Sequence, residues 1–159
     1  MDGNTVLDDF PRLLAEQHPE ATAAAVVHWT AQGAMRPGPG GQPAVWMHLR
    51  ATLDLAIGCQ RCLGPVVMPL QVDRWFRFVA DEATAEAEDN DSEEDVLALE
   101  PRPDLLNLIE DELLMELPLV PMHEACPVPL PLPAEEPVSA EDAASNRPHP
   151  FADLAKLRK

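Results

Sequence analysis

The amino-acid sequence predicts an α+β fold, an antiparallel β-sheet with a central hairpin that is covered by one or two helices. Two segments of alternating apolar and polar residues, 44–55 and 70–79, predict the hairpin, because successive side chains of a strand lie on opposite faces. The third observation is an apolar stripe at helical spacing within 104–117, bounded by prolines. An acidic loop and a proline-rich C-terminal extension complete the predicted architecture.

The segment before the hairpin is predicted to contain one short helix and one strand. Residues 8–17 have the pattern of a helix that Asp8 or Asp9 can cap. Residues 23–31 are rich in alanine and valine and are predicted to form a strand. The glycines and prolines of 33–43 predict a loop.

The predicted hairpin has one apolar and one polar face, joined by the turn CQRCLGP (59–65). Arg74 falls on the apolar face and suggests a β-bulge at that position. The apolar face collects Val45, Met47, Leu49, Ala51, Leu53, Leu55, Leu70, Val72, Phe76 and Phe78.

The chain after the hairpin is strongly acidic. Residues 81–100 carry ten acids and no base, which predicts a mobile acidic insert that ends in a short strand at VLAL (96–99). A helix is predicted over 101–118, beginning near Asp104. Its carboxylates are expected to form a solvated face opposite the leucines: Glu110, Asp111, Glu112 and Glu116.

These elements predict a single α+β domain over 1–126. Residues 127–159 are expected to form a proline-rich extension with a short basic segment at the C-terminal end.

The charge is distributed unevenly along the chain of 159 residues. The formal net charge is −17, and residues 81–146 alone carry −19. Residues 23–80 and 147–159 carry +3 each, so the acidic total hides two basic blocks. An acidic protein is a poor general ligand of nucleic acid, and RNA binding would have to use these blocks.

Several classes of protein are excluded by what the sequence lacks. It has no apolar run of about 18 residues, as a membrane helix needs, and its N-terminal segment has no signal-peptide pattern. Three cysteines without a secretory signal indicate a reducing compartment, so a cytoplasmic location is expected. No nucleophile elbow, phosphate-binding loop, dinucleotide turn or HExxH motif occurs, so neither catalysis nor a small-molecule substrate is expected.

Cys59 and Cys62 form a CxxC pair on the predicted hairpin turn, where both thiols can point to one side. His123 and Cys126 have a similar spacing, and the four together would make a Cys3His zinc site. The alternatives are reduced cysteines without a metal or a redox pair. The redox interpretation is disfavoured because no helix follows the CxxC motif.

The polar face of the hairpin interleaves arginines with aromatic side chains, a pattern that can grip RNA through phosphate contacts and base stacking. The alternative is an ordinary solvated sheet face. The candidate nucleic-acid-binding residues on and beside this face, and in the basic C-terminal segment, are Trp46, His48, Arg50, Arg61, Arg74, Trp75, Arg77, Lys156, Arg158 and Lys159.

Three blocks of sequence then point to one family: CQRCLGPVVMPLQV (59–72), DLLNLIEDELLMELPLVPMHEAC (104–126) and RPHPFADLAKLRK (147–159). Together they resemble the YceD family of large ribosomal RNA subunit accumulation proteins. The resemblance implies a non-catalytic bacterial ribosome-biogenesis factor, needed for synthesis, processing or stable accumulation of large-subunit (23S) ribosomal RNA. Some members carry more cysteines after the helix, resembling a complete zinc-ribbon set. This chain lacks a second CxxC after Cys126, so their set does not carry over.

Two mechanisms fit that role. The protein can bind the ribosomal RNA precursor or a pre-ribosomal particle through its arginines and C-terminal lysines, or its acidic segment can bind a basic large-subunit ribosomal protein. A zinc-knuckle structural or adaptor module unrelated to ribosomes is the alternative function.

Overall fold

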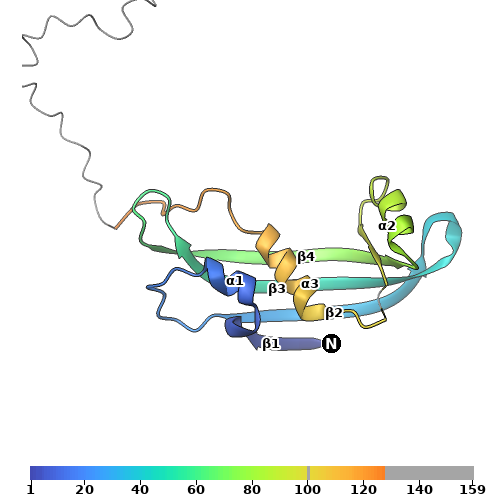
Figure 1. Cartoon of the computed structure of the whole chain (residues 1–159), viewed down its shortest axis with the longest axis horizontal. Coiled ribbons are helices and arrows are strands. Elements are labelled where there is room, and N and C mark those ends of the chain that lie inside the picture. Colours follow the sequence, from blue (N-terminus) through green and yellow to red (C-terminus); the bar gives the residue numbers. More distant parts are fainter. Residues whose placement is uncertain (100, 128–159) are drawn as a thin grey trace, which may run out of the picture. The chain divides into compact units, whose positions relative to one another are not determined.

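A five-stranded β-sheet dominates the computed structural model, which describes residues 1–99 and 101–127 (Figure 1). Within these residues the strands are β1 (Asp2–Val6), β2 (Val26–Pro37), β3 (Pro43–Gly58), β4 (Pro65–Val79) and β5 (Asp95–Ala98). The α-helices are α1 (Pro11–Glu16), α2 (Glu82–Asp89) and α3 (Leu105–Met115), with 3-10 turns at Leu7–Asp9 and Pro39–Gly41.

The strands lie in the order β1-β2-β3-β4-β5, so neighbours in the sequence are neighbours in the sheet. The first four strands pair in antiparallel fashion, and β5 adds a short parallel edge to β4. The predicted α+β fold with a central hairpin is therefore confirmed. None of the helices described is long and apolar enough to span a membrane.

The β3–β4 hairpin is longer than the alternation predicted, and its pairing is unbroken from Val45 opposite Phe78 to Gly58 opposite Pro65. The suggested bulge at Arg74 was wrong, because Arg74 sits in this register directly opposite Leu49. Its side chain turns toward α3, where its Nε lies 3.1 Å from Oε2 of Glu112. The ion pair allows an arginine to remain on the face that the helices cover.

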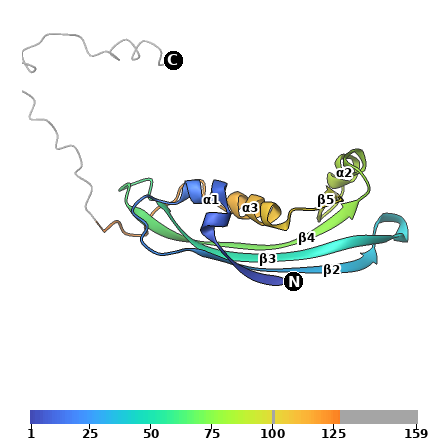
Figure 2. The ribbon, with the colours of Figure 1, turned by 60° about the horizontal axis from the view of Figure 1, so that its bottom comes forward.

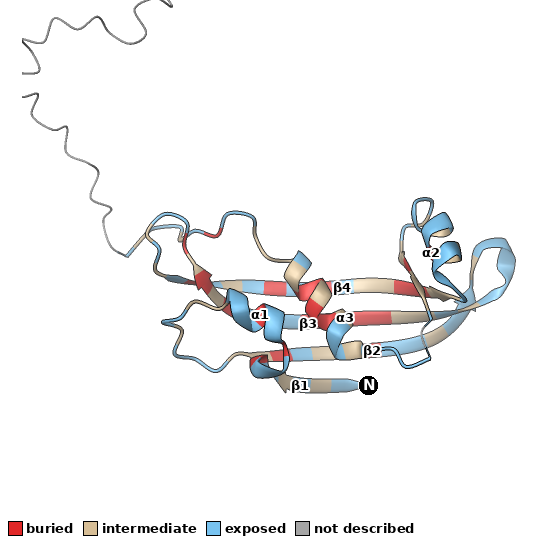
Figure 3. Cartoon of the chain, in the orientation of Figure 1, coloured by how far each residue is buried: buried red, intermediate tan, exposed pale blue. Residues whose placement is uncertain are grey.

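Helices α1 and α3 pack on one face of the sheet and bury the core there (Figure 2). Phe10 and Leu13 come from the α1 region, and Ile109 and Leu113 from α3, one turn apart on the same side of the helix. Burial of each such side chain stabilises the fold by roughly 1.5–3 kcal/mol. The sheet contributes buried residues in the middle of β3 and β4 (Figure 3), among them Leu49, Leu53, Leu55, Leu70, Val72 and Phe76.

Helix α3 begins at the residue that the sequence indicated. The carboxylate of Asp104 accepts a hydrogen bond from the backbone N–H of Asn107 at 3.1 Å, which satisfies one free donor of the first turn.

Substitution of Asp104 by alanine is expected to lower the free energy of unfolding by about 1 kcal/mol, because this cap is lost. Urea unfolding monitored by circular dichroism measures the change. Asp91→Ala, at an exposed position without a capping bond, is the matched control and should change stability by less than about 0.5 kcal/mol. Equal effects of the two substitutions would contradict the capping role.

Helix α1 is capped by a residue from another helix. Neither Asp8 nor Asp9 caps it, since its N-cap is Phe10 and no side chain of the cap residue bonds to the turn. Instead Oε1 of Glu110 accepts the backbone N–H groups of Arg12 at 2.7 Å and Leu13 at 3.0 Å. The expectation that the acids of α3 form a solvated face was therefore wrong for Glu110, and it was also wrong for Glu112, which is buried on the side of Arg74.

Two strand predictions need correction at the N-terminal edge of the sheet. The polar segment DGNTV gave no strand signal, yet it forms β1 by pairing with β2 from Asp2 opposite Thr30 to Val6 opposite Val26. Strand β2 also runs to Pro37, through part of the predicted loop 33–43. The turn is confined to the glycines after it, where Gly40 and Gly41 take the positive φ that glycine adopts without strain.

The loop predicted for the acidic segment was wrong for much of the described part, residues 81–99. The segment forms α2, whose N-cap Asp81 accepts a hydrogen bond from Thr84, and then β5, close to the predicted VLAL strand. The physical reason is a countercharge from the preceding strand, because the guanidinium of Arg77 in β4 bonds to the carboxylates of Glu88 and Glu94. The predicted extension 127–159 lies outside the described residues except for Pro127.

Candidate metal centre and nucleic-acid interface

The structure brings together the four residues of the predicted zinc site, which we call the Cys3His cluster: Cys59, Cys62, His123 and Cys126. One ligand atom from each residue lies within 4.8 Å of every other. The Sγ atoms of Cys59 and Cys126 are 4.0 Å apart, and Sγ of Cys62 is 3.4 Å from Nδ1 of His123. No disulfide joins any of the three cysteines. The spacing of the two pairs in the sequence thus correctly predicted their proximity.

The tight turn between β3 and β4 positions the two cysteines of the CxxC motif. The turn is closed by hydrogen bonds from Leu63 N to Cys59 O and from Cys59 N to Gly64 O, both 2.9 Å. Leu63 adopts a φ of 61°, which is uncommon for a residue with a side chain. No helix starts after Cys62, so the thiols lack the helix dipole that activates redox CxxC pairs.

The other two residues lie in the extended segment that follows α3. A hydrogen bond of 2.8 Å from Gln60 N to Pro121 O fastens this segment to the turn. The His123 ring is fixed by its Nε2, which lies 3.0 Å from the carbonyl oxygen of Pro65. Because a carbonyl only accepts, Nε2 carries the proton and the lone pair of Nδ1 points toward Cys62.

The surroundings favour a thiolate at Cys59. The backbone N–H of Cys62, with smaller contributions from those of His123 and Arg61, lowers the pKa of the Cys59 thiol to about 5 against the effect of burial. Burial instead raises the pKa of Cys126, whose thiol also lies against the other two cysteines. A thiolate beside further thiols and an imidazole nitrogen is the donor set of a structural zinc site.

The second candidate site is the sheet face opposite α1 and α3, which we call the outer face. Figure 2 shows that α1 and α3 lie on the other side. The acidic segment covers the outer face only near the end of β4, where Arg77, opposite Trp46 in the register, is buried by Glu88 of α2 and by Glu94. Near the β2–β3 turn the imidazole of His48 stacks on the indole of Trp75, with ring centroids 4.2 Å apart and planes 6° apart. The guanidinium carbon of Arg36 lies 3.7 Å from the ring centroid of Trp75. We call these three side chains the planar stack.

Arg36 was missed by the sequence analysis, because 33–43 was taken as a loop. The signal was present: once the alternation of β2 is continued to Pro37, Arg36 falls on the same face as Trp46 and Trp75. Asp73 completes the group, since it bonds to His48 Nε2 at 2.5 Å and to Arg50 Nε at 3.3 Å. The bond from His48 lowers the pKa of Asp73, with Arg50 adding to the effect.

Two of the predicted RNA-contacting arginines are engaged by carboxylates. Arg77 is 1% exposed and bonds to Glu88, Ser92 and Glu94. Arg74 faces the helix layer, where it is close to Asp95, Glu112 and Glu116. The expectation that Arg77 is exposed is corrected accordingly, because the acidic segment buries and neutralises it. Arg74 lies on the face that its place in the alternation indicated, and carboxylates neutralise it there.

The remaining predicted residues have different surroundings. Arg61 is exposed at the hairpin tip, where its guanidinium approaches the sulfur of Met122 at 3.9 Å. Trp46 is half-buried on the outer face, and its indole nitrogen is buried without a hydrogen-bond partner among the described residues. Lys156, Arg158 and Lys159 lie outside the described residues.

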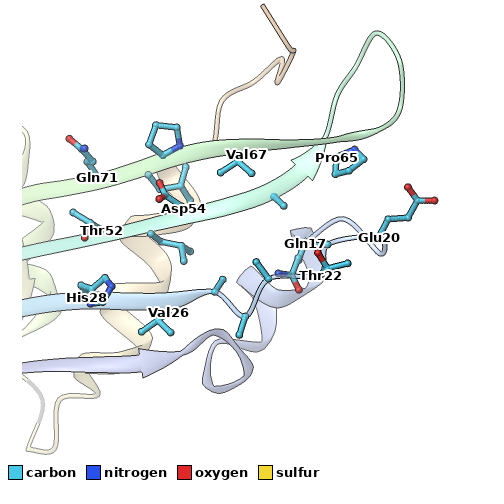
Figure 4. Close-up of a pocket in the computed structure, with 18 residues that line it drawn as sticks. Gln17, Glu20, Thr22, Val26, His28, Thr52, Asp54, Pro65, Val67 and Gln71 are labelled. Carbon is cyan, nitrogen blue, oxygen red and sulfur yellow. The ribbon is translucent and has the colours of Figure 1, made fainter. Parts of the chain in front are cut away.

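Two hollows mark the ends of the outer face. The one beside the β3–β4 turn is lined by Val26, His28, Thr52 and Val67, and its charged groups are the acids Glu20 and Asp54 (Figure 4). The one beside the planar stack is lined by Arg36, Trp46 and Trp75, together with Glu93 and Glu94 of the acidic segment. Phosphate groups are therefore disfavoured at the first hollow, and at the second they meet both signs of charge.

Comparison with known proteins identifies the family. The family model described as large ribosomal RNA subunit accumulation protein YceD matches residues 47–158, well over half of the chain. The chain belongs to the YceD family. A YceD protein of Haemophilus influenzae, described as large ribosomal RNA subunit accumulation protein, is 33% identical over 122 residues, which cover 74% of this chain and 68% of that protein. No solved structure matches this YceD-family chain significantly.

The match to the YceD family covers most of the candidate sites. It spans β3 from Met47 onward, β4, α3 and the whole Cys3His cluster, and on the outer face it includes His48 and Trp75 but not Trp46. It begins after β2, so Arg36 lies outside the matched residues.

Proposed function

We propose that this protein supports the accumulation of large-subunit ribosomal RNA in the cytoplasm as a non-catalytic factor that binds the RNA precursor or a pre-ribosomal particle. Membership of the YceD family and the description of its Haemophilus relative support the biological role. The planar stack on the outer face, with the exposed Arg36 in it, is the observation that favours direct contact with RNA.

Single-stranded RNA is the form that suits this surface. Unpaired bases stack on aromatic rings and on the guanidinium planes of arginines. The planar stack contains both kinds of group, with Arg36 exposed, Trp75 half-buried and His48 buried. Arg36 is exposed at one end of the stack, where a base could continue the column. Arg50 and Arg61 are exposed on the same hairpin and can reach phosphates.

A second mechanism for the same role is contact with a basic large-subunit ribosomal protein. Its supporting observation is the exposure of carboxylates that remain after Arg77 is satisfied, on α2 and the connection to β5: Asp81, Glu82, Glu86, Asp89, Asp91 and Glu93. Such a surface attracts a basic partner over distances of about one Debye length, which is about 8 Å at physiological salt.

Direct RNA binding is tested by one substitution in the planar stack and one matched control. We expect Arg36→Ala to weaken binding of single-stranded large-subunit RNA fragments about tenfold, because the stacking platform at the exposed end is lost. Fluorescence anisotropy at several salt concentrations measures the affinity. Arg102→Ala removes the same charge before α3, away from the outer face, and should change the affinity less than threefold.

The cellular counterpart of this measurement is the ratio of large- to small-subunit ribosomal RNA in cells depleted of the protein. Rescue by Arg102→Ala with failed rescue by Arg36→Ala would support the RNA contact. Failed rescue by Glu82→Gln/Glu86→Gln with normal rescue by Arg36→Ala would support the basic protein partner instead. An unchanged ratio after full depletion would contradict the proposed role itself.

A further inference from the structure

We propose that the Cys3His cluster binds one structural zinc ion, through the sulfur atoms of Cys59, Cys62 and Cys126 and Nδ1 of His123. This inference concerns the hairpin turn and is independent of whether the outer face binds RNA. The descriptions of the family and of the Haemophilus relative name no metal, and the arrangement of the four side chains is what points to zinc.

The distances in the cluster fit a tetrahedral zinc ion. Zinc–sulfur bonds of about 2.3 Å and zinc–nitrogen bonds of about 2.0 Å place ligand sulfurs about 3.8 Å apart and sulfur and nitrogen about 3.5 Å apart. The corresponding distances are 4.0 Å between Sγ of Cys59 and Cys126 and 3.4 Å between Sγ of Cys62 and Nδ1 of His123. The other ligand atoms lie within 4.8 Å of one another, so a contraction of at most about 1 Å in the widest pair would complete the site.

The donor atoms select zinc among common divalent ions. Thiolate sulfur and imidazole nitrogen are poor ligands of magnesium and calcium, which prefer oxygen. The imidazole is also prepared as a ligand, because the hydrogen bond from Nε2 to Pro65 O leaves Nδ1 unprotonated and fixes the ring. Four protein ligands leave no open position for a substrate, so the site is structural.

A disulfide explains the cluster less well. Bonded sulfurs are about 2.05 Å apart, so Cys59 and Cys126 would have to approach by almost 2 Å. A disulfide would also not explain why Cys62 lies close to His123 or why the imidazole has a fixed orientation. A single metal ion accounts for all four side chains at once.

The ion would fasten the segment after α3 to the β3–β4 turn. Outside the cluster, two further contacts join this segment to the turn: the hydrogen bond of Gln60 to Pro121 and the contact of Arg61 with Met122. Zinc would therefore fix the exposed guanidinium of Arg61 at the hairpin tip. The segment 121–126 supplies two of the four ligands, so its folding would depend on the ion.

The test is metal analysis of the full chain, purified under reducing conditions and supplied with zinc sulfate. We expect one zinc ion per chain, and cobalt chloride in place of zinc should give the intense visible absorption of tetrahedral cobalt with a thiolate charge-transfer band. His123→Ala should weaken zinc binding about a hundredfold or more. His28→Ala, at an exposed histidine outside the cluster, is the matched control and should bind zinc normally.

A conservative variant separates ligation from folding. His123→Cys supplies a thiolate in place of the imidazole and should retain one zinc per chain, with a stronger charge-transfer band in the cobalt form. The proposal would be overturned by a chain that takes up no zinc, by stoichiometric iron in its place, by undiminished zinc in His123→Ala, or by a Cys59–Cys126 disulfide found by mass spectrometry of the protein purified without exposure to air.

Discussion

Replacement of Arg77 by methionine is expected to lower the stability of the α2–β5 region by about 2–4 kcal/mol. The guanidinium is buried, and its donors bond to Glu94 at 2.6 Å, Glu88 at 2.5 Å and Ser92 at 3.0 Å. Methionine keeps most of the apolar stem, so the change removes chiefly the charge and its hydrogen bonds. Without the arginine, the buried or half-buried carboxylates have no countercharge. The free energy lost in this way is larger than the free energy that the intact ion pair contributes to stability.

The loss should first appear locally. Amide hydrogen exchange at Val96 and Leu99 reports opening of this region, because Leu99 N bonds to Val79 O beside the β4–β5 pairing. Arg50→Met is the matched control, because Arg50 is exposed and, within residues 1–99 and 101–127, pairs only with the exposed carboxylate of Asp73. This substitution should cost less than about 1 kcal/mol.

A triple variant tests the physical reason for the effect. Arg77→Met combined with Glu88→Gln and Glu94→Gln removes the unpaired charges as well and should recover at least half of the lost protection. A triple variant as labile as Arg77→Met, or an Arg77→Met protein as stable as the wild type, would contradict the role of Arg77 as the countercharge of the acidic segment.

Local patterns in the sequence predicted the centre of the sheet but not its acidic edge. Apolar and polar residues alternate over 44–55 and 70–79 because one face of each strand is buried. Each strand carries this pattern in its own sequence, so the hairpin could be predicted from the alternation. Charge repulsion within 81–100 is equally local and predicted a loop. The structure of that segment depends on Arg77, a residue of the preceding strand whose burial no local pattern reveals.

The same distinction applies to the candidate sites. The Cys3His cluster could be predicted, because cysteine and histidine are rare enough in this chain for two similar spacings to stand out. Whether it holds zinc stays a prediction. The outer face was predicted only in part, since Arg36 was assigned to a loop and Arg77 to the surface. Sheet pairing places Arg36 on this face, and the acidic segment that follows β4 buries Arg77.

Helix α3 carries two buried glutamates that are expected to act on stability with opposite signs at neutral pH. Burial alone would raise the pKa of Glu110, but the N–H of Leu13 and the guanidinium and N–H of Arg12 outweigh it and hold this pKa below the usual range. Burial raises the pKa of Glu112; the neighbouring acids Asp95, Asp111 and Glu116 add to this, and Arg74 only partly opposes it. One carboxylate is thus stabilised as an anion by folding, and the other is destabilised.

Glu110→Gln is therefore expected to lower the free energy of unfolding at pH 7 by about 2–3 kcal/mol, because charge-assisted hydrogen bonds to the first turn of α1 are weakened. Glu112→Gln is expected to be neutral or to stabilise by up to about 1 kcal/mol, because a poorly compensated buried charge is removed. The two residues lie on the same helix and undergo the same change, so each is the control of the other.

The pH dependence follows from the directions of the two pKa shifts. The contribution of Glu110 is present above the ordinary carboxyl pKa of about 4.3 and is lost as the pH falls through its lower folded value. The contribution of Glu112 is present below that ordinary value and is lost as the pH rises through its higher folded value. Urea unfolding of the three proteins at pH 7 and pH 4 should therefore show the penalty of Glu110→Gln shrinking and any gain from Glu112→Gln disappearing toward acid. Equal penalties for both substitutions at pH 7, unchanged at pH 4, would show that α3 uses the two carboxylates alike and would contradict the capping of α1 by Glu110.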